Sequence, residues 1–247
     1  MTNSLPERRC LECGLELQAD QRFCCRCGQR TDLERLTLGE IGHEFVHALV
    51  HADRSAAALL RSLLLRPGVV AREYVLGKRR RYFGPFATLV ILLGVATLLS
   101  ELVGFESITS DAQLNALQNF INRHVNVVVF LQVPLLALLC SLLFRRDRFN
   151  LAEHTVLVAY TFCLRAILFI FFILPYAYFF HPSTGFVGYL LWALWSVYFG
   201  VAAAQFYTGN RLASWFKGMV AAAFIYPATA VLINWLSWAY DQLKPSS

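Results

Sequence analysis

Residues 155–180 read TVLVAYTFCLRAILFIFFILPYAYFF, a stretch that is almost entirely apolar. Its single charged side chain is Arg165. Because an α-helix rises about 1.5 Å per residue, a run of this length can cross the roughly 30 Å hydrocarbon core of a bilayer. The stretch therefore predicts a membrane-spanning helix that is tilted or broken near Pro175.

The rest of the chain repeats this apolar pattern. Hydrophobic residues make up 57% of the sequence and charged residues 15%, whereas soluble domains are closer to about 45–50% and 25%. This composition excludes a disordered chain, a coiled coil and an ordinary soluble enzyme. We expect an all-α integral membrane protein with about five transmembrane helices, whose other four apolar runs are 86–103, 125–144, 186–207 and 219–240.

Cations are unevenly distributed between the loops that alternate along the chain. Residues 1–82, which precede the first span, hold 14 of the 22 Lys and Arg residues. Two later loops add cations on the same side of the membrane: Arg145, Arg146, Arg148, Arg211 and Lys217. The other side has only Arg123 and Lys244. Because cytoplasmic loops are richer in Lys and Arg, the sequence predicts a cytoplasmic N-terminus and an exterior C-terminus.

Five of the seven cysteines lie in the first 27 residues. Four of them form two C-x-x-C pairs, namely Cys10, Cys13, Cys24 and Cys27. Each pair can direct two thiolates from one tight turn, and Gly14 and Gly28 follow where such turns often need a positive φ. The first residues lack the apolar core of a signal peptide, so we expect a reducing cytoplasm and metal rather than disulfides. The pattern predicts a 1–30 ribbon folded by one structural zinc ion, with Cys25 as a spare thiol.

The charge of this ribbon indicates its kind of partner. Residues 1–30 contain five arginines, three glutamates and one aspartate, a net charge of +1. Binding to the phosphates of nucleic acid needs a stronger basic footprint. We therefore expect the ribbon to contact a cytoplasmic protein or to be purely structural, and we expect no nucleic-acid partner.

Residues 31–82 are predicted to form an amphipathic helical linker. Leu38, Ile41, Phe45 and Leu49 recur at helical spacing. A second helix over 56–65 is expected to end at Arg66-Pro67-Gly68, and a third over 70–76 is expected to end at Gly77. The cluster that follows, Lys78, Arg79, Arg80 and Arg81, is predicted to bind anionic lipid headgroups, with each cation contributing about 1 kcal/mol. A nucleic-acid patch is the rival interpretation of the cluster.

His43-Glu44-Phe45-Val46-His47 matches the H-E-x-x-H pattern of zinc metalloproteases. The helical spacing places its histidines, with His51, opposite the apolar stripe of the linker. A protease also needs a strand edge to hold its substrate, and this segment offers none. We interpret the pattern as a solvated polar face, and a membrane metalloprotease centred on His43, Glu44 and His47 stays as an alternative.

Ionisable side chains inside membrane spans often carry function. Arg165 lies deep in its span, where its long side chain cannot easily reach water. Its candidate partners on other spans are Gln132, Asn234 and Glu101. The sequence allows either a hydrogen bond that stabilises helix packing or a small transporter or channel that uses Arg165. Glu153-His154 is expected to hold the cytoplasmic ends of neighbouring helices together.

Several short motifs are shared with a known family. They are Cys10-x-x-Cys13-Gly14, Phe23-Cys24-x-x-Cys27-Gly28-Gln29, His43-Glu44-Phe45, Pro67-Gly68, Glu73-Tyr74-x-x-Gly77-Lys78-Arg79-x-x-Tyr82-x-x-Pro85 and Glu153-His154. On these motifs the chain resembles an uncharacterised bacterial inner-membrane family, catalogued as a domain of unknown function, with a zinc ribbon and several transmembrane helices. The resemblance implies bound zinc and an inner-membrane location, and it implies no reaction. His47 is not part of the shared pattern.

These observations predict three regions: a zinc ribbon at 1–30, a cytoplasmic helical linker at 31–82 and a five-span domain at 83–247. Our leading hypothesis is a non-enzymatic adaptor, anchored in the inner membrane, whose ribbon and linker engage a cytoplasmic protein. The metalloprotease and the transporter are the two alternatives.

Overall fold

The computed structural model describes residues 8–18, 20–31, 37, 56–79, 82–103, 125–180 and 184–243. A small ribbon at the N-terminal end has two antiparallel strands, β1 (Arg8–Arg9) and β2 (Glu16–Leu17). The remaining described elements are helical. They are α2 (Ala56–Leu65), α3 (Pro67–Val75), α4 (Pro85–Val103), α6 (Val125–Leu143), the 3-10 turn η1 (Arg145–Asp147), α7 (Leu151–Leu168), the π-helical segment η2 (Phe169–Ile173), α8 (Leu174–Phe180), α9 (Thr184–Phe206) and α10 (Arg211–Leu243).

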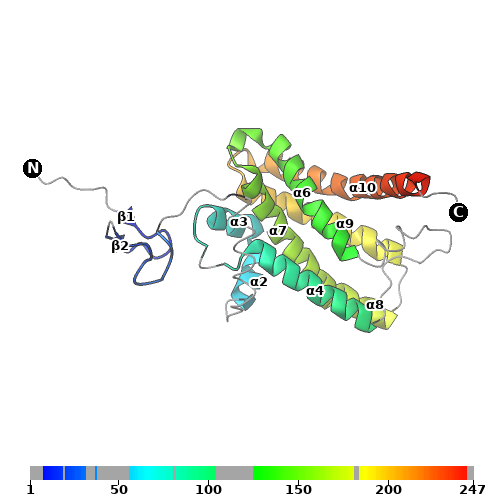
Figure 1. Ribbon diagram of the computed structural model, residues 1–247, viewed down its shortest axis with the longest axis horizontal. Helices are drawn as coiled ribbons and strands as arrows, with labels where there is room; N and C mark the ends of the chain where they lie inside the picture. The colour runs from blue at the N-terminus through cyan, green and yellow to red at the C-terminus, as the bar shows by residue number, and fades with distance from the viewer. Residues whose placement is uncertain are drawn as a thin grey trace, which may run out of the picture.

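The long helices form one bundle in which α7 is central. In Figure 1, α4, α6, α7–α8 and α9 run along the long axis of the molecule, with the ribbon beyond one end of the bundle and the C-terminus at the other. α7 contacts α4, α6, α9 and α3. Its residues are buried on every side from Ala152 to Leu164, because it is surrounded by other helices. The predicted all-α class is confirmed.

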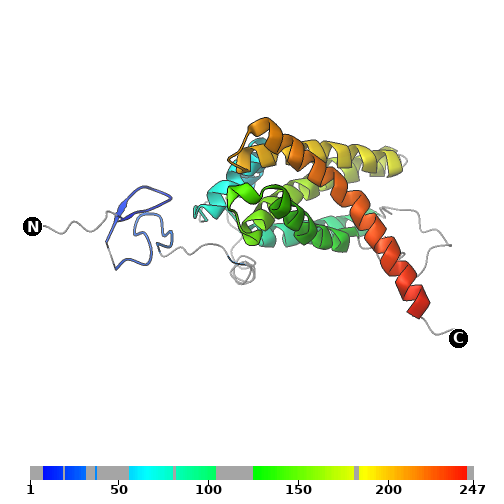
Figure 2. The same cartoon turned by 90° about the horizontal axis from the view of Figure 1, so that it is seen from above.

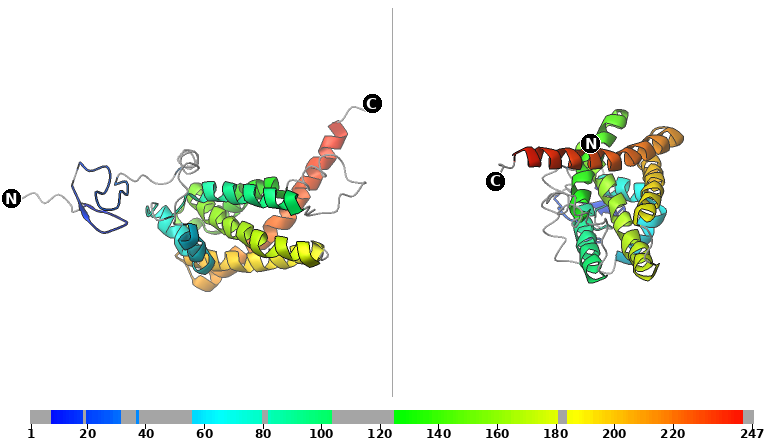
Figure 3. Two further views of the ribbon diagram at one scale, coloured as in Figure 1. Left: turned by 90° about the horizontal axis from the view of Figure 1, so that it is seen from below. Right: turned by 90° about the vertical axis from the view of Figure 1, so that its right-hand side faces the viewer.

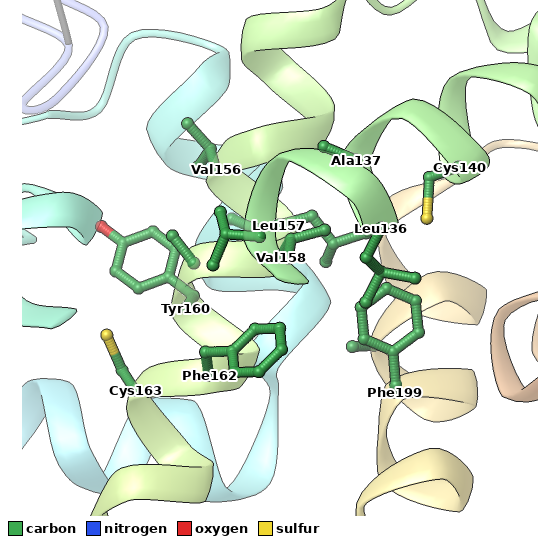
Figure 4. Close-up of a cluster of buried hydrophobic side chains, with 14 of the residues drawn as sticks. Leu136, Ala137, Cys140, Val156, Leu157, Val158, Tyr160, Phe162, Cys163 and Phe199 are labelled. Carbon is green, nitrogen blue, oxygen red and sulfur yellow. The ribbon is translucent and has the colours of Figure 1, made fainter. Parts of the chain in front are cut away.

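The core lies where α6, α7 and α9 meet. Figure 4 shows the side chains of Leu136 and Ala137 from α6 against Val158 and Phe162 of α7, with Phe199 of α9 beside them. These side chains are essentially inaccessible to solvent. A bundle in lipid gains little from hydrophobic burial between helices, so close packing of this kind is what holds it together.

Four helical segments are long and apolar enough to cross a membrane: Pro85–Val103, Leu151–Phe180, Gly188–Phe206 and Arg211–Leu236. α6 is also apolar, but its part from Val128 to Leu143 is shorter than these four. The structure thus supports a multi-pass membrane protein with four candidate spans, one fewer than the five expected.

The helix is not broken at Pro175, but it is irregular in the turn before this proline. From Phe169 to Ile173 the helix widens into a π-helix, and the N–H of Leu174 donates to the carbonyl of Phe169. Proline has no N–H to donate to the preceding turn, and π-turns are a common way to accommodate the lost bond. The helix therefore continues from Leu151 to Phe180 without ending at Pro175.

α7 and α10 begin a full turn or more before the apolar runs that predict them. α7 starts at Leu151 because Asn150 forms a capping box, in which its side chain accepts from the N–H of Glu153 and the Glu153 carboxylate accepts from the N–H of Asn150. α10 starts at Arg211, where Asn210 accepts bonds from the next backbone N–H groups. The residues after both caps include polar ones, so a search for apolar runs does not detect these turns.

The turn expected at Arg66-Pro67-Gly68 is only partly right. α2 ends at Leu65 as predicted, but Pro67 is the first residue of α3 and Gly68 is helical. Proline is favoured at this position because its ring presets φ and the first N–H has no helical partner. α3 therefore begins earlier than the predicted residue 70.

Several predictions fall outside the described residues. These are the amphipathic stripe from Leu38 to Leu49, the H-E-x-x-H pattern of His43, Glu44 and His47 with His51, and the cations Arg80 and Arg81. They stay predictions.

Candidate metal centre and its junction with the helical bundle

The two C-x-x-C pairs fold into two equivalent turns. The carbonyl of Cys10 accepts from the N–H of Gly14, and the carbonyl of Cys24 accepts from the N–H of Gly28. In the same way, the N–H of Cys10 donates to the carbonyl of Leu15, and the N–H of Cys24 donates to the carbonyl of Gln29. Gly14 and Gly28 have φ of 72° and 68°, a region that glycine adopts without the steric cost other residues meet. Both glycine predictions are confirmed.

These turns bring the four sulfur atoms of Cys10, Cys13, Cys24 and Cys27 together. The Sγ atoms all lie within 4.8 Å of one another, with Cys10 to Cys27 at 3.5 Å and Cys13 to Cys24 at 3.6 Å. A tetrahedral zinc with bonds of about 2.3 Å requires sulfur–sulfur separations of about 3.8 Å. The cluster therefore fits one metal ion of zinc size, and Cys25 is exposed outside it.

The thiols of the cluster have unequal acidity. Backbone N–H groups of Cys27 and Arg26 donate to the sulfur of Cys24 and lower the pKa of this thiol to about 6. The N–H of Gln29 acts in the same direction on Cys27, but burial and the neighbouring thiols outweigh it and raise that pKa to about 12. A divalent cation would favour the thiolate form of all four.

The ribbon contacts the helical part of the chain through Gln29. Its side chain is only 4% exposed, and its Nε2 donates to the carbonyl of Gly77, 2.9 Å away and 48 residues later. The carbonyl of Gln29 accepts from Cys24, so one residue links a metal-site turn to the end of α3. Sequence reasoning missed this contact because nothing in the pattern pairs residues so far apart.

The partner of Gln29 belongs to a group we call the junction motif: Pro67, Gly68, Glu73, Tyr74, Gly77, Lys78, Arg79, Tyr82 and Pro85. Gly77 has φ of 104° and ends α3. The N–H of Lys78 bonds to the carbonyl of Glu73 and the N–H of Gly77 to that of Tyr74, which is the Schellman arrangement that favours glycine. The predicted role of Gly77 as a helix stop is confirmed.

Glu73 connects both sides of the turn after α3. One carboxylate oxygen accepts from Lys78 Nζ at 3.0 Å, and the other accepts from the Tyr82 hydroxyl. Lys78 is thus paired with a carboxylate of the protein although its side chain is 36% exposed, and Arg79 is half-buried. Binding of this basic cluster to lipid headgroups stays a prediction.

The junction motif also packs against the central helices. Tyr74 is buried with its ring edge-on to that of Tyr160, the centroids 5.8 Å apart, and the Tyr160 hydroxyl donates to the carbonyl of Phe83 at 2.7 Å. At the other end of α3, the N–H of Gly68 donates to Gln205 on α9. These contacts fix α3 against α7 and α9, and the motif residues at this junction serve packing and turns.

Arg165 has one of its expected partners. Its Nη1 donates to Gln132 Oε1 at 3.3 Å, and Gln132 Nε2 donates to Thr229 Oγ1 at 3.0 Å. This chain joins α7, α6 and α10. The other two candidates, Asn234 on α10 and Glu101 on α4, are exposed.

Glu153 and His154 have different roles. Glu153 caps its own helix, whereas His154 Nδ1 lies 2.7 Å from the hydroxyl of Tyr207, at the end of α9. His154 is 1% exposed. His154 therefore links α7 to the end of α9.

Residues 60–97 match a family described as a protein of unknown function (DUF3667). The matched segment runs from the end of α2 through the junction motif into α4, so the expected similarity to an uncharacterised family holds for this segment. No curated protein and no solved structure matches the chain.

Proposed function

We propose that this protein is an adaptor of the bacterial inner membrane that presents a zinc ribbon to a cytoplasmic protein. In this proposal Cys10, Cys13, Cys24 and Cys27 hold one structural zinc ion. Residues 1–30 form the ribbon, 31–82 the cytoplasmic linker and 83–247 a five-span domain. The basic cluster from Lys78 to Arg81 contacts anionic headgroups.

The observation that carries the proposal is the buried bond from Gln29 to Gly77. It holds the ribbon at the end of the bundle where α4 begins, as Figure 1 shows. A ribbon with a fixed position relative to a membrane domain can act as a platform, because a partner that binds it is placed at the membrane surface. The ribbon also exposes Leu11 at 55% and Phe23 at 58%, and aromatic side chains such as that of Phe23 are enriched at protein–protein interfaces.

Five spans, with the two ends of the chain on opposite sides of the membrane, are supported by the course of the helices. In Figure 1, α4, α7–α8 and α10 run away from the ribbon, and α6 and α9 run back toward it. α6 contacts both α7 and α10. A helix in this position is embedded to the same depth as its neighbours, so α6 is counted as the second span.

Photocross-linking in membranes tests the adaptor function. A photoreactive phenylalanine is placed at Leu11 or Phe23, and as a control at Phe171, which is 64% exposed on a candidate span. We expect the two ribbon positions to give one discrete protein adduct, to be identified by mass spectrometry, and the control to give lipid adducts only.

Two further variants sharpen this test. Replacing all four cluster cysteines by serine should abolish the protein adduct, and Gln29→Ala should reduce it, because the ribbon then loses its attachment to Gly77. The adaptor proposal fails if the ribbon positions give only lipid or self adducts, or if the cysteine-free protein gives the same adduct with equal yield.

A further inference from the structure

Arg165 is a cation placed near the middle of a membrane span. It lies about 21 Å from Leu151, the first residue of the continuous helix that ends at Phe180. A charged side chain at this depth is costly unless it is paired, and such residues usually mark a binding or transport site.

No carboxylate pairs with this guanidinium in the part of the chain that the structure describes. Its only hydrogen-bond partner there is the neutral amide oxygen of Gln132. The central guanidinium carbon of Arg165, Cζ, also lies 5.6 Å from the ring centroid of Phe162 and 5.5 Å from that of Trp195. Because a guanidinium has five N–H donors, most of them remain available, and the side chain is only partly buried.

Two further donors, Trp192 and Tyr226, lie one turn before residues that contact Arg165 or its partner Gln132, namely Trp195 and Thr229. Tyr226 on α10 is three residues before Thr229, which accepts from Gln132, and its ring centroid is 6.3 Å from that of Trp192 on α9. The indole N–H of Trp192 is buried and has no hydrogen-bond partner among the described residues. A cation, a phenol and an unsatisfied indole N–H thus gather at one level of the bundle, with nothing anionic among the described residues there.

α10 leaves the bundle at this same level. Its buried residues from Ala221 onward end at Thr229, and the described side chains from Ala230 onward are exposed or half-buried. Figures 2 and 3 show the C-terminal part of α10, in red, diverging from the other helices. Arg165, which is only half-buried, can therefore be approached sideways from the lipid phase.

We propose that Arg165 anchors a binding site for a carboxylate carried on an apolar chain, such as a long-chain fatty acid. The planar guanidinium matches the two oxygens of a carboxylate, and the indole N–H of Trp192 and the Tyr226 hydroxyl can donate to the same group. The indole and phenyl faces of Trp195 and Phe162, with the lipid-facing side of α10, suit an apolar chain. The site is independent of the adaptor function, since it shares no residue with the ribbon or the junction motif.

Quenching of tryptophan fluorescence by brominated lipids tests this site directly. In a reporter protein, Trp215→Phe, Trp235→Phe and Trp238→Phe leave Trp192 and Trp195 as the only indoles. The purified full chain in non-ionic detergent at mildly alkaline pH is titrated with dibromostearic acid and, separately, with dibromostearyl alcohol. Both probes partition into the micelle and quench at short range, but only the acid can ionise.

We expect the acid to reach half-quenching at about a tenfold lower concentration than the alcohol, as hydrogen bonds to a charged group should give. Arg165→Gln should remove this difference, and Arg165→Lys should keep part of it. Arg211→Gln changes an exposed arginine outside the site and should leave the difference intact. The alcohol titration also reports folding, because a collapsed Arg165→Gln variant would alter quenching by the alcohol.

Equal quenching by the two probes in the reporter protein would overturn the proposal, whatever the variants do. An acid preference that survives Arg165→Gln would also overturn it. Octanoate should reverse the quenching by the acid and acetate at equal concentration should not. If acetate reversed the quenching as well as octanoate does, the site would bind a carboxylate without an apolar chain, and that would overturn the proposed ligand class.

Discussion

Gly68 has no room for a side chain. A Cβ atom there would lie 2.0 Å from the carbonyl oxygen of Ala202 and 2.7 Å from the Cβ of Gln205. Neither the backbone of Ala202 nor the Cβ of Gln205 can move aside without shifting α9. Gly68→Ala should therefore push α3 away from the bundle. We expect a loss of about 1–3 kcal/mol in the free energy of unfolding, measured as a lower melting temperature of the purified protein.

Gly94 supplies the matched control for this change. It lies inside α4, and a Cβ there would meet nothing within 4 Å. Gly94→Ala should be neutral or should stabilise the helix by about 0.5–1 kcal/mol. Equal melting temperatures for the two alanine variants would show that the close approach of α3 to α9 is not under steric constraint.

The neighbours Cys24 and Cys25 differ in their expected metal chemistry. The sulfur of Cys24 belongs to the four-sulfur cluster, whereas Cys25 is exposed outside it. Cys24→Ser should therefore release the zinc ion and make the ribbon sensitive to protease, because zinc binding supplies most of its folding energy. Cys25→Ser should retain a full complement of zinc, measured by atomic emission. Loss of metal from both variants would show that the set of ligands is wrong.

At the level of single elements, α7 depends on a cap that hydropathy does not detect. The side chain of Asn150 accepts from the N–H of Glu153 and begins the helix. Asn150→Ala should cost about 1 kcal/mol of stability, whereas Asn150→Ser should cost little, because serine can also cap. Chemical denaturation in detergent can compare the two. A serine variant as unstable as the alanine variant would mean that the cap does not stabilise α7.

Hydropathy located the apolar part of every long helix because a span needs a minimum length of apolar residues. Hydropathy predicted both ends of α4 and of α6 to within one residue, since their apolar runs and their helices coincide. It placed the start of α10 at residue 219 instead of Arg211, because the first two turns carry Arg211 and Lys217 and are held by a cap at Asn210. Polar helix ends depend on hydrogen bonds, which a hydropathy average cannot register.

For the sites, the sequence predicted local geometry and missed distant contacts. The cysteine spacing was enough to place four sulfurs together, since two short turns set most of that geometry. Depth in the span was enough to suggest Gln132 for Arg165. The bond from Gln29 to Gly77 could not be predicted, because it depends on how the ribbon lies against α3.

At the level of the whole molecule, the proposed five spans would place the two ends of the chain on opposite sides of the membrane. A reporter that is active only outside the cytoplasm should work when fused after Ser247 and should fail when fused before Met1. With α6 outside the membrane, four spans would remain and the ends would share one side. A C-terminal reporter active only in the cytoplasm would therefore contradict the count.

The amount of zinc in the whole chain separates an adaptor from a protease. We expect one zinc ion per chain, and none once the four cluster cysteines are replaced by serine. A metalloprotease site at His43, Glu44 and His47 would instead hold a second ion that survives those replacements and disappears in His47→Ala. Glu44→Gln would keep this second ion and lose cleavage, since glutamate is the base there. Two ions per chain would overturn the adaptor proposal.

The Gln29–Gly77 bond also has a consequence for how the chain is made. Synthesis proceeds from the N-terminus and domains fold as units, so the four cysteines leave the ribosome well before α4 can enter the bilayer. A ribbon that has already taken up its ion is then ready to receive Gly77 as α3 emerges, 48 residues after Gln29. Metal supply during translation would thus decide whether the first helix enters the membrane beside a folded ribbon or an unfolded one.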